Sequence, residues 1–340
     1  MGVVEAMDRF QQRRSWAGLP IAVAYKFFDD QGSYLAALVA YYALLSLFPL
    51  LLLLSSLLGF ALQGNPRLQL DILTSTLSQF PVIGPQLRST GLRGTGTGVL
   101  VGVLGSVYGA LGVAQAVQHL MNVAWAVPRN RRPNPILARA RSLLLLATAG
   151  AAVVATTVLS ALGSAAESFG ASSLGAGAKA LLILISVLVN AGVFLVAFRI
   201  ATARNLTWRQ SAPGALSAAI AWQLLQVFGA LLVGHVLKHA TAVNGVFGLV
   251  LGLLAWLYVT SVAITLSVEL NVVLAKRLWP RALLTPFTDD VDLTRGDRHS
   301  YADTAKAQRA KGFETVDVSF DNDGQNASRP SRPDTDQRRP

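Results

Sequence analysis

The chain contains no cysteine and few charged side chains. Without cysteine it has no disulfide bonds and no thiolate metal sites. Charged residues make up 14% of its 340 residues, whereas a soluble domain carries about 25%. So few charges do not cover a water-facing surface, and the 52% of hydrophobic residues place the chain among membrane proteins.

Carboxylates are scarce outside the last part of the chain. Residues 285–340 hold 9 Lys/Arg and 11 Asp/Glu, which leaves 20 basic and only 7 acidic side chains in residues 1–284. A basic balance can indicate nucleic-acid binding, but these basic residues lie in short segments between apolar runs, a pattern that orients membrane proteins. We therefore expect membrane lipids as partners, and no nucleic acid.

Common catalytic motifs are also missing. The sequence contains no HExxH, GxxxxGK[ST] or GxSxG motif. Metal or phosphate chemistry needs converging carboxylates or imidazoles, and the 7 acidic residues before Thr285 are widely scattered. We expect no enzyme activity, no metal site and no cofactor.

Long apolar runs, by contrast, are frequent. A membrane-spanning helix needs about 20 apolar residues, and six stretches qualify: about 34–62, 97–126, 143–163, 179–198, 213–237 and 245–270. With the N-terminus placed in the cytoplasm, the inside segments hold 15 Lys/Arg and the outside segments 5. This bias predicts an all-α, six-span membrane domain over residues 34–284 with both termini cytoplasmic.

Three further segments flank or interrupt the spans. Residues 1–33 are predicted to form a cytoplasmic interfacial segment with aromatic anchors. Residues 66–80 begin with Asn65-Pro66 and repeat large apolar side chains at helical spacing, which predicts an amphipathic helix on the outer surface. Residues 285–340 are rich in Asp, Arg, Pro, Asn and Ser, and we expect a largely disordered cytoplasmic tail.

Proline and glycine mark the first two spans. Pro49 lies in the middle of span one, where it is expected to kink the helix, either as a hinge or as a static packing feature. In span two, glycines at positions 98, 102, 105, 109 and 112 follow one face, and their GxxxG spacing predicts a close approach of another helix.

Polar side chains within the spans are the candidate functional residues. They are Gln115, His119, Asn122, Gln223, Gln226 and Glu269. Because polar groups in hydrocarbon need partners, we predict that they line an inward-opening cavity whose basic rim suits an anionic headgroup. Hydrogen bonds between helices, or a position at the interface, are the alternative explanation.

Glu269 is the only carboxylate within or at the edge of the six runs. Ionisable groups in the membrane are functional candidates, because a buried charge is costly. The alternative is a structural ion pair at the cytoplasmic interface, since Lys276 and Arg277 follow it closely.

Three segments in order resemble one family of membrane proteins. They are Ala36–Pro49 (AALVAYYALLSLFP), Asn122–Trp125 before a basic loop, and the last hairpin with Val243-Asn244-Gly245, Trp256-Leu257-Tyr258 and Glu269-Leu270-Asn271. This combination resembles the YihY / virulence factor BrkB family over about residues 15–280. The resemblance implies a six-helix protein of the bacterial inner membrane that is associated with envelope integrity and, in some members, virulence.

The polar candidates for a cavity lining, the proline in span one and the glycine faces predict a transport function. The transported molecule would be a lipid or other envelope molecule that crosses the cytoplasmic membrane. The rival hypothesis is a structural or assembly scaffold without transport. The family also carries the older label ribonuclease BN, but the inside loops offer arginines without the carboxylates or histidines that an RNase needs.

Overall fold

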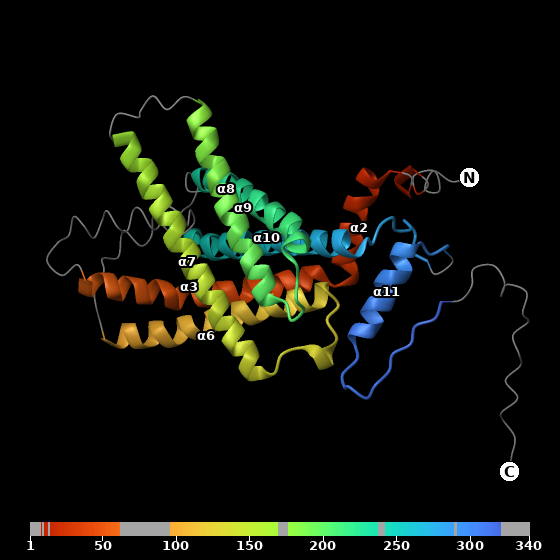
Figure 1. Cartoon of the computed structure of the whole chain (residues 1–340). Helices are drawn as coiled ribbons and strands as arrows, with labels where there is room; N and C mark the ends of the chain where they lie inside the picture. The colour runs from red at the N-terminus through yellow and green to blue at the C-terminus, as the bar shows by residue number, and fades with distance from the viewer. Residues whose placement is uncertain are drawn as a thin grey trace, which may run out of the picture.

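The computed structural model describes residues 8, 10–12, 14–61, 96–168, 176–236, 242–288 and 291–320, and no strand occurs in these ranges. The helices are α2 (Ser15–Asp29), α3 (Gly32–Ala61), α6 (Gly96–Ala124), α7 (Pro135–Ser168), α8 (Ala176–Ala201), α9 (Trp208–Val236), α10 (Ala242–Lys276) and α11 (Arg295–Ala307), with a short 3₁₀ helix at Arg129–Arg131. Figure 1 shows α3 and α6 running side by side, α7 and α8 crossing them steeply, and α2 and α11 at one end of the long helices.

Within the described residues, five helices contain a stretch long and apolar enough to cross a membrane. These stretches are Gly32–Leu50 in α3, Val99–Ala124 in α6, Pro135–Val154 in α7, Ile183–Ala201 in α8 and Val250–Lys276 in α10. The predicted all-α, multi-pass architecture is confirmed, but the count of six is not. The 29-residue α9 is long enough, yet within its described part it is not among the helices of sufficient apolar content, and Gln223 and Gln226 lower its hydropathy. The predicted helix at 66–80 lies outside the described residues.

The glycine face of α6 packs against α3, as the spacing predicts. A Cβ added at Gly109 would lie 2.5 Å from the Cα and Cβ of Ser46, and one at Gly105 would lie 2.7 Å from the ring of Pro49. Pro49 lies inside α3, which continues as one helix from Gly32 to Ala61. The two helices therefore approach so closely because glycine leaves room for the backbone and for the proline ring.

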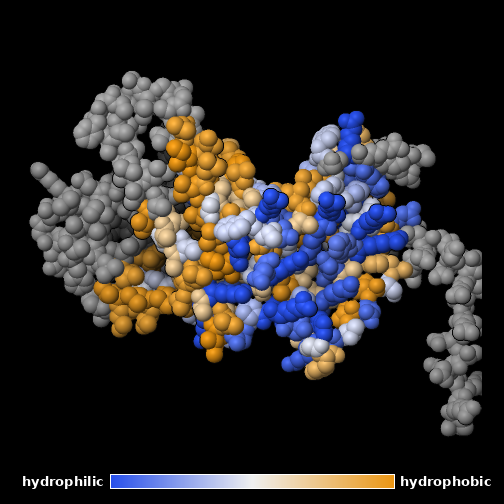
Figure 2. Space-filling model, in the orientation of Figure 1, coloured by the Kyte–Doolittle hydropathy of each residue, from blue (hydrophilic) through white to orange (hydrophobic). Residues whose placement is uncertain are grey.

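Apolar side chains cover the outside of the long helices. Leu100, Leu104, Val154, Leu188 and Phe228 are all more than half exposed, and in Figure 2 the described surface of this region is mainly hydrophobic. Such a surface is unfavourable in water and suits lipid. The hydrophilic surface gathers around α2, α11 and the neighbouring loops (Figure 2). We call this region, where α3 begins and α10 ends, the polar end.

The predicted interfacial segment at the N-terminus contains α2, which packs on α10 and α3. Trp16 and Phe28 on α2 are 67% and 72% exposed, whereas Ala22 and Lys26 are buried. One face of α2 therefore covers the bundle and the other presents aromatic side chains to the surroundings.

Residues 295–307 form α11 where the sequence predicts a disordered tail. The helix begins with a capping box: the Thr294 hydroxyl accepts from the Asp297 backbone N–H, and the Asp297 carboxylate accepts from the Thr294 N–H. Gly296, Asp297, Ser300 and Ala307 are buried. The expectation of disorder is wrong for this stretch, because composition does not reveal that capping and buried polar contacts hold a polar helix. Residues 321–340 lie outside the described part.

Candidate functional site

The fully buried Glu269 of α10 lies next to Lys26 of α2 at the polar end. The Glu269 carboxylate is 3.8 Å from the Lys26 Nζ, and the side chains are 0% and 3% exposed. Lys26 also forms a hydrogen-bonded ion pair with Asp30, one turn further along the chain. Neither carboxylate oxygen of Glu269 has a hydrogen-bond partner in the described structure. One ammonium thus faces two buried carboxylates.

Neighbouring charges keep Lys26 protonated. Burial alone would lower the pKa of Lys26, but the Glu269 and Asp30 carboxylates outweigh that effect and raise the pKa above its ordinary value. The other charges nearby have separate partners: Lys276 pairs with Asp303 at 2.7 Å, and Asp29 pairs with Arg281. Lys26 is therefore the cation that forms an ion pair with Glu269.

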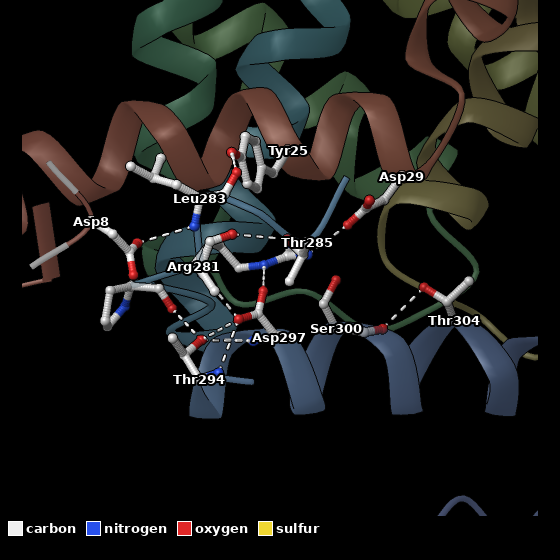
Figure 3. Close-up of polar contacts among 12 residues, drawn as sticks. Asp8, Tyr25, Asp29, Arg281, Leu283, Thr285, Thr294, Asp297, Ser300 and Thr304 are labelled. Atoms are coloured by element: carbon white, nitrogen blue, oxygen red, sulfur yellow. Dashed lines mark hydrogen bonds and ion pairs between the residues drawn. The ribbon is translucent and has the colours of Figure 1, made fainter. Parts of the chain in front are cut away.

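A second buried ion pair, drawn in Figure 3, attaches α11 to the polar end. The Arg281 Nε donates to Asp297 Oδ1 at 2.5 Å, and its Nη2 donates to Asp29 Oδ2 at 2.8 Å. Arg281 and Asp297 are both 0% exposed. Burial alone would lower the pKa of Arg281, but the two carboxylates outweigh burial and raise it. The segment after α10 is thereby fixed to α2 and to α11 at once.

Backbone groups complete this network (Figure 3). The Asp297 Oδ2 accepts from the Ala282 N–H at 3.0 Å, Asp8 accepts from the Leu283 N–H at 3.0 Å, and the Tyr25 hydroxyl donates to the Leu283 carbonyl at 2.7 Å. The N-terminal residues 8–29 and the two neighbouring segments around 281–285 and 294–304 are thus joined at the polar end.

The six predicted cavity residues lie in different environments. Gln115 and His119 are exposed, Gln223 and Gln226 are half-buried, and Asn122 and Glu269 are buried. Asn122 accepts a hydrogen bond from the Ala203 N–H at 2.9 Å and so joins α6 to the turn after α8. Glu269 lies beside Lys26 instead of beside the exposed side chains of α6. Glu269 therefore belongs to a buried charged cluster and Asn122 to a hydrogen bond between helices, whereas the other four side chains are exposed or half-buried.

Sequence reasoning missed Lys26, Asp30, Arg281 and Asp297 as members of the site. Two local signals were present. Lys26 and Asp30 have the i,i+4 spacing of a helical ion pair, and Thr294-x-x-Asp297 has the spacing of a capping box. The pairing of Arg281 with Asp297 and Asp29 bridges segments that no local pattern connects.

Apolar helices that pack through glycine, with the buried charges of the described residues gathered at one end, define a multi-pass helical membrane protein. The chain matches the model of the virulence factor BrkB family over residues 23–286, and it belongs to that family. "Putative ribonuclease-like protein YfkH" of Bacillus subtilis (strain 168) is 26% identical over 259 residues, which cover 73% of this chain and 91% of the relative. No solved structure matches the chain.

Proposed function

We propose that the protein translocates a lipid or other envelope molecule across the bacterial cytoplasmic membrane, with the polar end and both termini in the cytoplasm. The observation that carries this proposal is the charge arrangement at Glu269. A carboxylate that is fully buried near the end of a spanning stretch and makes no hydrogen bond in the described structure is costly for a merely structural group.

The excess negative charge gives Glu269 a chemical role in transport. Lys26 neutralises one of the two carboxylates, so the cluster keeps one uncompensated charge unless it binds a proton or another cation. Binding at Glu269 weakens its attraction to Lys26. Since Lys26 belongs to α2 and Glu269 to α10, loading or release of a cation changes how firmly α2 is held over the bundle.

The close-packed seam between α3 and α6 supports the same proposal. Glycines 102, 105, 109 and 112 of α6 lie directly against α3, and small residues at an interface let two helices approach closely. The seam combines this close contact with Pro49, which cannot donate an intrahelical hydrogen bond, and movement between α3 and α6 at this point is part of the proposal.

The test is a leaflet-exchange assay on the full chain. The protein is reconstituted into phosphatidylethanolamine/phosphatidylglycerol vesicles with a trace of fluorescent phospholipid, and loss of fluorescence on adding dithionite reports exchange with and without a pH gradient. We expect faster exchange than in protein-free vesicles, dependent on the gradient and abolished by Glu269→Gln. Asp303→Asn removes another carboxylate of the polar end that is 28% exposed, and it should leave exchange unchanged.

A scaffold for envelope assembly is the second candidate. Phe287 and Phe313 are 83% and 87% exposed in the segments after α10, where large aromatic side chains facing water suit a protein partner. Exchange no faster than in empty vesicles would reject lipid translocation and favour the scaffold.

We further propose that the chain is not an enzyme, although its relative is named ribonuclease-like. Among the described residues, no group of three or more His, Cys, Asp or Glu is placed to hold a metal ion. The basic loop after α6 contains no carboxylate or histidine of its own, and His119 of α6, which interacts with Arg129 and Arg132, is a single imidazole without a carboxylate partner among the ion pairs of the described residues. RNA cleavage by the purified chain, lost in a folded point variant, would overturn this proposal.

A further inference from the structure

A pocket of about 280 Å³ lies at the turn that joins α8 to α9. Its polar lining consists of Arg199, Arg204, Asn205 and the indole of Trp208, and its apolar lining includes Val196 and Ile200. It is a different site from the Lys26–Glu269 cluster, with which it shares no residue. A pocket lined both by positive charge and by aliphatic side chains suits an amphipathic anion.

The guanidinium of Arg199 is held in place by the protein. Its Nε donates to the Leu206 carbonyl at 3.0 Å, and its Cζ lies 3.8 Å from the centre of the Trp208 ring. The single hydrogen bond at Nε leaves the two terminal nitrogens for an anion. A stacked arginine loses little freedom when it binds phosphate, and two parallel N–H groups match two phosphate oxygens.

The positive charge of the pocket has no local counter-charge. No Asp or Glu occurs between Ala176 and Val236, and within the described ranges neither Arg199 nor Arg204 belongs to any of the ion pairs, which all involve α2, α10, α11 or the segment between them. Two arginines that line one pocket without a carboxylate repel each other, so a bound anion relieves that repulsion.

The rest of the turn is fixed by hydrogen bonds to neighbouring helices. The Arg141 Nη1 of α7 donates to the Thr202 carbonyl at 3.3 Å, and Asn122 of α6 accepts from the Ala203 N–H. The backbone that carries Arg199 and Arg204 is therefore anchored from two sides, which is what a preformed binding site requires.

The position of the pocket identifies the source of the anion. The spanning stretch of α8 ends at Ala201, so Arg199 lies in its last turn and Arg204 follows it directly. Trp208 is 55% exposed, and a tryptophan at this level is typical of the headgroup region. A ligand there has its phosphate beside the arginines and its acyl chains along Val196 and Ile200.

We propose that this pocket binds the phosphate of an anionic phospholipid headgroup. The proposal does not depend on transport: it holds whether the chain moves lipids or only scaffolds the envelope, because it concerns a fixed lipid at the surface of α8 and α9. Basic pockets between spanning helices recognise anionic headgroups by this chemistry.

The experiment measures lipid binding to the purified full chain in detergent by native mass spectrometry. Short-chain phosphatidylglycerol is compared with phosphatidylcholine of equal chain length and with inorganic phosphate. We expect the affinity for phosphatidylglycerol to fall on the order of tenfold in Arg199→Gln/Arg204→Gln. The control Arg131→Gln/Arg139→Gln removes the same charge from exposed positions of the polar end outside the pocket and should bind as the unchanged chain does.

Each remaining outcome decides against the proposal. Equal affinity for phosphatidylcholine, or an equal loss in both double variants, would mean that the arginines of the pocket do not select the headgroup. Inorganic phosphate that displaces phosphatidylglycerol at equal concentration would assign the pocket to a free anion. If the Arg199 variant does not fold, Arg204→Gln alone decides, because Arg204 is exposed and its loss should still weaken phosphatidylglycerol binding.

Discussion

The docking of α11 depends on the buried carboxylate of Asp297. This carboxylate accepts hydrogen bonds from the Arg281 Nε, from the Ala282 N–H, and from the backbone N–H and hydroxyl of Thr294. Asp297→Asn keeps the size of the side chain but removes its charge, and it turns an N–H group toward a donor. The variant should therefore weaken the attachment of α11 without creating a cavity.

The size of the effect follows from the burial of the pair. Removing one partner of a buried ion pair costs about 3–5 kcal/mol. Arg281 keeps its contact with Asp29, so we take the lower value of about 3 kcal/mol. This value corresponds to roughly a hundredfold larger population of the undocked helix. Asp303→Asn on the same helix breaks the partly exposed pair with Lys276 and should cost at most about 1 kcal/mol.

Limited trypsin digestion measures this population, because cleavage within a folded segment tracks its open fraction when opening is fast. Mass spectrometry follows cleavage after Arg295 and Lys306, which lie within α11. We expect cleavage there to accelerate about a hundredfold in Asp297→Asn and less than about fivefold in Asp303→Asn. Equal rates in the two variants would refute the assignment of Asp297 as the anchor of α11.

Three further predictions concern the bundle. Because the pKa of Lys26 is raised on folding, its contribution to stability is complete at neutral pH and is lost as the pH rises through that raised pKa. Thermal unfolding measured from about pH 7 upward should show this loss of stability. The variant Lys26→Met should not show this pH dependence. Gly109→Ala places a Cβ 2.5 Å from Ser46, whereas Gly150→Ala meets nothing within 4 Å, so denaturant unfolding should show a loss of about 1–3 kcal/mol for the first and almost none for the second. Accessibility tags within 127–142 and after Lys276 should report cytoplasmic and tags within 82–96 and 165–177 outside; a cytoplasmic signal from 82–96 would contradict the topology.

The sequence predicts the membrane domain well because hydropathy and glycine spacing are local signals. Apolar runs long enough to span a bilayer leave few alternatives to a membrane-spanning helix. The small-residue face of α6 predicts a close helix contact, and the structure contains this contact. The tail was harder to predict. Its composition is typical of disorder, and α11 depends on Asp297 meeting Arg281, which lies 16 residues earlier in the chain.

The candidate site could be predicted only in part. Glu269 stands out because it is the one carboxylate in a long apolar run, but its partner Lys26 lies more than 240 residues away in the sequence. Helical periodicity gives the face of a residue on its own helix and says nothing about which helix lies opposite. Gln115 and His119 therefore shared a polar pattern with Asn122, although only Asn122 is buried.

Asn271 offers a test of how α9 is held against α10. Its side-chain oxygen accepts from the Gly214 N–H at 2.6 Å, and a Cβ at Gly214 would lie 2.1 Å from the Ser267 carbonyl oxygen. The two helices are thus in backbone contact at a point where α9 has just passed Pro213. Asn271 is 0% exposed, so its side-chain carbonyl is shielded from bulk water in the folded chain.

Asn271→Ala should therefore destabilise the folded chain by about 1–3 kcal/mol, since a buried donor loses its acceptor. Asn190→Ala is the matched control, because the amide of Asn190 donates to Ser186 of its own helix at 3.0 Å and joins no second helix; its cost should stay within about 0.5 kcal/mol. Denaturant unfolding in the same detergent compares the two. Equal losses would mean that α9 is held by its apolar contacts alone, and the α9–α10 hydrogen bond would then contribute nothing to holding this helix in the bundle.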